Sequence, residues 1–196
     1  MKQMKKSLLT LVLLVCSVLL WKPVQAEAAE KTVGNLVLMV DFVGDTSYFQ
    51  TNYKNCEAIY TKQSVNSVHA YISAISDGKV TVNSFFPQDN NNTFVSITLT
   101  KSCMEYTETE FITEVVNQVN ALCESGKIAA ITAGLDTGNQ EGCIDNVTLL
   151  VKVGSGQDDK SGPYYPHKAD GAGQWELFGK KVAAYNVIPS TRLWIE

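Results

Sequence analysis

The chain has 196 residues, of which 16 are basic and 20 are acidic, and its formal net charge is −4. No basic patch follows the N-terminal lysines, so nucleic acid is not an expected partner. The length fits one domain with a sizeable hydrophobic core.

The N-terminus has the pattern of a secretory signal peptide. Lysines precede an apolar run over residues 8–21, and small residues around Ala26 resemble a cleavage site. We therefore expect a signal peptide at 1–26 and a secreted domain at 27–196, with a net charge near −8 after four lysines are lost. An uncleaved membrane anchor is the alternative. No later stretch is long enough to span a bilayer, so no membrane association is expected after cleavage.

The elements that follow alternate between strand and helix patterns. The run NLVLMVDF at 35–42 is almost continuously apolar, as in a strand buried on both faces. Alternating β-branched residues predict further strands at 79–87 and 94–100. Before these two strands, residues 64–78 are predicted to contain a helix, because apolar side chains recur there at helical spacing: Val65, Val68, Ile72 and Ile75.

The clearest helix signal is the sequence TETE from Thr107, which matches a capping box, and Gly126 suits a left-handed helix end. A buried strand at 146–154, a long loop at 155–174 and a last strand at 181–190 follow. This order predicts a mixed α/β domain with a twisted sheet of about five strands and two packing helices.

The two histidines raise the question of a zinc site or a catalytic base. A helical zinc motif needs H-E-x-x-H, and the chain has no His-Glu dipeptide. His69 lies in a predicted helix and is interpreted as a surface or boundary residue. His167, in the loop sequence GPYYPHKADGAG, has three interpretations: a metal ligand, the base of a hydrolase that uses a distant acid, or a structural residue.

The segment LDTGNQEGCIDNV, residues 135–147, carries hard oxygen ligands among glycines, which suits Ca²⁺. It does not have the spacing of an EF-hand. An acidic turn that enters a strand is the alternative. The calcium candidates are Asp136, Asn139, Glu141 and Asp145.

Four cysteines follow the predicted signal peptide. An even number in an exported chain favours at least one disulfide, and the pairing stays open. No C-x-x-C occurs, so neither a zinc knuckle nor a thioredoxin-like site is indicated. The cysteines are Cys56, Cys103, Cys123 and Cys143.

Five blocks within residues 35–190 carry a resemblance to a known family. In order they are NLVLMVDF, SVHAYISAISDGKVTV, LDTGNQEGCIDNVTLLVKVG, YYPHK and VAAYNVIPS. Together they resemble the N-terminal part of the catalytic domain of immune-inhibitor-A-like secreted bacterial zinc metallopeptidases. Asp77 stands where the family has a tyrosine, and Tyr165 stands where it has a tryptophan.

The resemblance implies a zincin-like α+β domain that cleaves protein or peptide substrates with zinc. The family's H-E-x-x-H helix follows the last block, whereas this chain ends at Glu196. We therefore expect a truncated and inactive form without a zinc site, in which one sheet face lacks its cover and a C-terminal segment is needed as a partner. The resemblance also makes Tyr165, Pro166 and His167 a cleft-wall or structural element.

A second interpretation is a non-catalytic exported α/β module. Such a module binds a peptide or protein by adding an extended segment to the edge of its sheet. The strand predicted at 181–190 is the candidate edge.

Overall fold

A computed structural model describes residues 30–44, 48–61, 64–137, 140–154, 162–171 and 173–192. The predicted signal peptide lies outside these residues. Among the helices described, none combines the length and the hydropathy that a membrane span requires.

The fold is built around β1 (Lys31–Phe42), the longest strand. Its first half pairs with β2 (Val80–Phe85) and its second half with β3 (Ser96–Leu99), both in parallel. The strand predicted at 35–42 is therefore confirmed, and its residues are buried as expected for the centre of a parallel sheet.

The other half of the sheet continues in the order β1, β5, β9, β6. Strands β5 (Asn146–Val151) and β9 (Ala184–Pro189) run parallel to β1, whereas β6 (His167–Asp170) is antiparallel to β9 and outermost. The loop predicted at 155–174 thus contains a strand. A small second sheet joins β4 (Cys143–Ile144), β8 (Lys180–Val182) and β7 (Glu176–Leu177).

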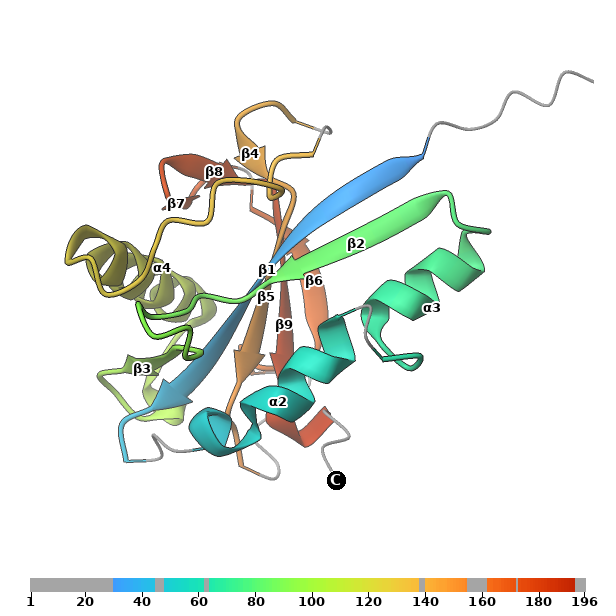
Figure 1. Cartoon of the computed structure of the whole chain (residues 1–196). Helices are drawn as coiled ribbons and strands as arrows, with labels where there is room; N and C mark the ends of the chain where they lie inside the picture. The colour runs from blue at the N-terminus through green and yellow to red at the C-terminus, as the bar shows by residue number, and fades with distance from the viewer. Residues whose placement is uncertain are drawn as a thin grey trace, which may run out of the picture.

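Helices lie on both sides of the main sheet (Figure 1). Helix α4 (Glu108–Glu124) packs on one face, where its apolar side chains join Leu36, Leu38 and Val40 of β1. Helices α2 (Tyr48–Tyr60) and α3 (Val68–Ile75) lie on the other face. There the core contains Val37 and Met39 of β1, as the alternation of a strand requires.

The α/β fold class is confirmed, but two details of the helix prediction are wrong. The described residues contain three α-helices where the sequence predicted two, and the additional helix is α2. Helix α3 begins after Ser67, whose side chain accepts from the Ala70 amide, so Val65 precedes the helix and is 88% exposed. Its other end, Ile75, is also exposed.

The predicted strand at 181–190 is divided between β8 and β9. Strand β9 pairs with β5 on one side and with β6 on the other, so it is not an edge. The edge expected for peptide binding is therefore wrongly placed, and the outermost strand on that side of the sheet is β6.

Candidate functional site

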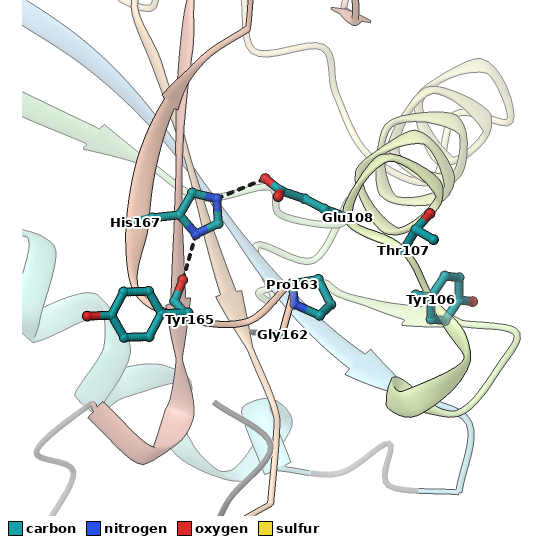
Figure 2. Close-up of a pocket in the computed structure, with 7 residues that line it drawn as sticks. All are labelled: Tyr106, Thr107, Glu108, Gly162, Pro163, Tyr165 and His167. Atoms are coloured by element: carbon teal, nitrogen blue, oxygen red, sulfur yellow. Dashed lines mark hydrogen bonds and ion pairs between the residues drawn. The ribbon is translucent and has the colours of Figure 1, made fainter. Parts of the chain in front are cut away.

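His167 begins β6 and points toward the N-terminus of α4 (Figure 2). Its Nε2 atom lies 2.8 Å from Oε1 of Glu108, and its Nδ1 atom lies 2.6 Å from the carbonyl oxygen of Tyr165. Both neighbours accept hydrogen bonds, so the two contacts are satisfied together when both ring nitrogens carry a hydrogen. The side chain therefore joins β6 and the preceding loop to α4.

Glu108 is placed by the start of α4. The Thr107 side chain accepts from the Glu110 amide, and the Glu110 carboxylate accepts from the Thr107 amide, so the predicted capping box is confirmed. A carboxylate in this first turn is favoured by the helix dipole. Glu108 also accepts a hydrogen bond of 2.6 Å from the hydroxyl of Tyr185. Burial, and then the bond to Glu108 and its charge, raise the pKa of Tyr185.

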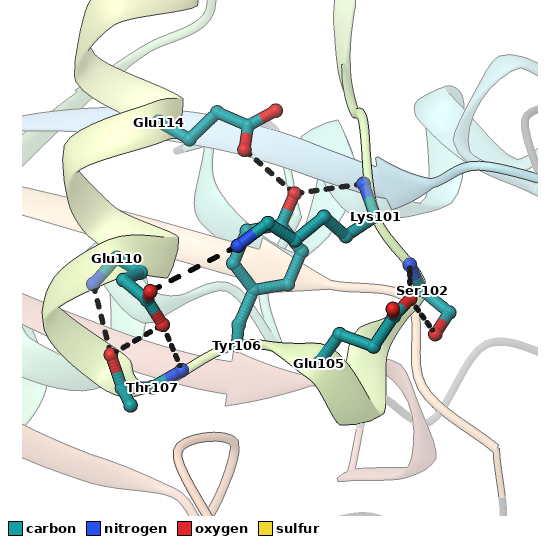
Figure 3. Close-up of polar contacts among 7 residues, drawn as sticks. All are labelled: Lys101, Ser102, Glu105, Tyr106, Thr107, Glu110 and Glu114. Atoms are coloured by element: carbon teal, nitrogen blue, oxygen red, sulfur yellow. Dashed lines mark hydrogen bonds and ion pairs between the residues drawn. The ribbon is translucent and has the colours of Figure 1, made fainter.

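A second set of contacts holds the loop before α4 (Figure 3). The Tyr106 hydroxyl donates to Oε2 of Glu114 at 2.7 Å and accepts from the amide of Lys101. The Lys101 ammonium lies 5.1 Å from the centre of the Tyr106 ring and 3.9 Å from Glu110. Burial raises the pKa of Tyr106, and Glu114 adds to this. These contacts fix one wall of the space in front of His167.

That space is a cavity of about 550 Å³, open to solvent, between α4 and the segment before β6. Tyr165 and His167 line it, whereas Pro166 is half-buried beside it. A hydrolase would need a nucleophile next to a histidine with one acceptor nitrogen. Both nitrogens of His167 face acceptors, and the Thr107 hydroxyl in the wall is bonded to Glu110, so this arrangement does not favour that alternative.

A groove of about 490 Å³ lies on the opposite face of the sheet, between α3 and β6. Its sides include Val68 and Ile72 of α3 and Lys168 of β6. Asn35, Asn146, Thr148 and Asn186 line it as well. They belong to a row of amides and hydroxyls that crosses four strands through hydrogen bonds of 2.7–3.1 Å. The row consists of Ser84, Asn35, Thr148, Asn146 and Asn186.

Two of the four calcium candidates, Asp136 and Asp145, are used in other contacts. Asp136 accepts hydrogen bonds from the Lys180 ammonium and from the Gly142 amide. Both bonds lower the pKa of this carboxyl group, and the bond from Lys180 has the larger effect. Asp145 accepts from the amide of Gly34 and from Thr137. Glu141 is exposed, and Asn139 lies outside the described residues.

The histidines do not share a zinc site. His69, on α3, contacts the carbonyl oxygen of Val82 at 2.8 Å, so it is the boundary residue that the sequence predicted. His167 lies on the other face of the sheet against α4. Within the described ranges no three His, Cys, Asp or Glu side chains are grouped to hold a metal ion. The residues present do not fit the family's zinc centre.

The predicted disulfide is not formed: no such bond joins any of the four cysteines, all of which are described. Cys56 is buried on the α2 face, whereas Cys103 and Cys123 pack on the α4 face, so the sheet separates them. Cys103 precedes α4 and Cys123 lies on its last turn, about 20 Å of helix apart, whereas a disulfide needs Cα atoms within about 7 Å. Cys143 lies on β4 of the small sheet.

Sequence reasoning did not find Glu108, Tyr185 or the amide row. Glu108 was within the capping-box sequence, but its partner His167 is 59 residues away. The asparagines had a weak signal, since amides are uncommon within buried strands. Compared with known proteins, the chain matches no family model and no curated protein sequence.

Proposed function

We propose that this chain forms the strand-and-helix part of a secreted zinc-metallopeptidase-like domain, and that it holds an extended protein or peptide substrate along β6. The observation that carries the proposal is the position of β6, a short antiparallel strand at the outer edge of a parallel sheet. The five sequence blocks that resemble the immune-inhibitor-A-like family support it independently.

The surroundings of β6 suit an extended ligand. The cavity beside His167 lies on one face of the strand, and the groove beside Lys168 lies on the other. Side chains of an added strand alternate between the two faces of a sheet. A peptide paired with β6 would therefore direct successive side chains to the cavity and to the groove, while its backbone completes the ladder.

Cleavage would need zinc ligands, and the printed sequence contains no H-E-x-x-H motif. The family's H-E-x-x-H helix would supply two imidazoles and a general base, and zinc would activate the attacking water. In this proposal the chain contributes substrate binding and is inactive without that segment. Calcium binding by the turn at 135–147 stays a prediction, which calorimetric titration with CaCl₂ tests.

Two measurements test the proposal. Amide exchange of the purified protein is followed with and without unfolded casein, and slower exchange at Lys168 and Asp170 is expected because their backbone groups would pair with the ligand. The coding sequence beyond codon 196 is expected to contain an H-E-x-x-H motif within a few dozen codons. Unchanged exchange along β6 would remove the basis for substrate binding there.

A non-catalytic binding module is the second candidate, and the position of both His167 ring nitrogens against oxygen atoms favours it. It shares the ligand position along β6 but predicts no cleavage. Casein that binds and stays intact, with or without added zinc and with no H-E-x-x-H downstream, would select this candidate. Cleavage that a zinc chelator abolishes would select the metallopeptidase.

A further inference from the structure

The outermost strand β6 has the sequence His-Lys-Ala-Asp, and two opposite charges lie on one of its faces. Side chains of a strand alternate, so Lys168 and Asp170 share the groove face, whereas His167 and Ala169 share the α4 face. Lys168 and Asp170 are both exposed. The edge thus presents a positive and a negative side chain separated by one small residue.

The backbone of the same two residues points to the open side. The amide of Gly171 donates to the carbonyl oxygen of Ala183 at 2.8 Å, and bonded and non-bonded pairs alternate along an antiparallel ladder. The backbone N–H and C=O groups of Ala169 therefore face β9, and those of Lys168 and Asp170 face away from it. A strand added here would bond to the two charged residues.

We propose that β6 pairs antiparallel with β6 of a second copy of this chain, about a twofold axis at Ala169. In this register Lys168 of each copy lies opposite Asp170 of the other, and each such pair has its backbone groups directed at the partner. Side chains directly opposite one another share a face, about 5 Å apart at Cβ, so both pairs join opposite charges. The edge is self-complementary, as a twofold interface requires.

Charged side chains on an edge strand usually prevent it from pairing with the same strand of another copy, because like charges then lie opposite each other. That argument does not hold in this register, since each lysine lies opposite an aspartate. The contact is short, with four residues in each strand, so we expect a weak dimer that salt dissociates. It occupies the edge to which the proposed function assigns substrate, so peptide binding and dimerisation are mutually exclusive.

Sedimentation velocity of the purified protein over a range of concentrations tests the interface. A monomer–dimer equilibrium is expected, and Lys168→Glu or Asp170→Lys is expected to weaken it at least about tenfold, because each change puts two like-charged pairs in place of two attractive ones. Mixing the two variants is expected to restore a heterodimer, in which every pair again joins opposite charges. Lys79→Glu, an exposed change away from β6, is the control.

The outcomes separate this interface from the proposed function. A wild-type protein that stays monomeric at all concentrations overturns the dimer, as does a dimer that neither charge reversal weakens. Weakened variants that fail to recombine on mixing also overturn it, since the pairing is then not reciprocal. In each case slower exchange along β6 with casein would still support substrate binding.

Discussion

The Nε2 atom of His167 lies 2.8 Å from Oε1 of Glu108, which ties the outermost strand β6 to the first turn of α4. Tyr185 of β9 donates to the same oxygen at 2.6 Å. One carboxylate thus joins two neighbouring strands to the helix that covers them. Because the bond and the charge of Glu108 favour the neutral phenol, they add to the effect of burial and raise the pKa of Tyr185.

Replacing that carboxylate is expected to change the ionisation of Tyr185. In Glu108→Gln the charge is lost while the shape is kept, so the pKa of Tyr185 falls toward its ordinary value, although burial still keeps it raised. Ultraviolet titration of the tyrosines follows the change, and Tyr185→Phe identifies the contribution of this residue. Glu124→Gln, at the exposed end of α4, is the control. An identical titration curve for Glu108→Gln contradicts the bridge.

Stability is expected to decline in mild alkali through Cys56. Burial, with a further contribution from the charge of Asp41, raises the pKa of this thiol from 9.0 to about 11. The unfolded chain therefore loses the proton first, and the stability that the thiol contributes below pH 9 is lost as the pH rises toward 11.

Urea unfolding at pH 8, 9 and 10 measures this decline. In Cys56→Ala the slope of the unfolding free energy against pH is expected to be shallower, by at most about 1.4 kcal/mol per pH unit. Burial also raises the pKa of Tyr60, but this phenol affects stability only above its ordinary pKa of 10.0. Cys123→Ala controls for removing a thiol elsewhere. Equal slopes for Cys56→Ala and wild type would contradict the assignment.

The cap of α4 is expected to contribute measurably to stability. Thr107→Ala removes the hydroxyl that accepts from the Glu110 amide, and the loss is expected to be about 1 kcal/mol. Thr109→Ala, on the exposed side of the same first turn, is expected to change stability by less than about 0.5 kcal/mol. Chemical denaturation of both variants checks the difference, which disappears if the capping box contributes nothing.

Local signals predicted the elements that depend on local chemistry. The apolar run of β1 and the TETE start of α4 were sufficient, because burial on both faces and capping leave a direct pattern in the sequence. Gly126 was expected to end α4, and its φ of 70° agrees. Helix α2 had no such signal, since its first turn has no acidic residue and its last turn no basic one.

Pairing between segments that are far apart in the chain could not be predicted from the sequence. Strand β6 is four residues long and polar, and its conformation is set by β9, which follows it. The same holds for the site, where Glu108 and His167 meet only because β6 lies beside the start of α4. The disulfide prediction failed for a related reason: an even count of cysteines says nothing about the layers in which they lie.

A close crossing of the chain predicts that Gly34 is intolerant of substitution. A Cβ atom at this position of β1 would lie 2.2 Å from the carbonyl oxygen of Gly134 and 2.5 Å from Cα of Leu135. Since both are backbone atoms, the crossing segment must move, and Gly34→Ala is expected to cost about 3 kcal/mol. Gly126→Ala, which meets nothing within 4 Å but has a φ of 70°, is expected to cost about 1 kcal/mol. If urea unfolding gives similar losses of unfolding free energy for Gly34→Ala and Gly126→Ala, the close crossing at Gly34 is contradicted.

The amide row predicts that Asn35 stabilises the centre of the sheet. Its Oδ1 atom accepts from Asn146 at 2.7 Å and from Thr148 at 2.8 Å. The residue as a whole is only 3% exposed. Asn35→Ala leaves the buried Thr148 hydroxyl without this acceptor, so a loss of about 3 kcal/mol in the unfolding free energy is expected. Asn83→Ala, exposed on β2, is the matched control and should stay within about 0.5 kcal/mol of wild type. If Asn35→Ala matches that control, water in the groove replaces the amide at no cost, and the row is then a solvated surface rather than part of the core.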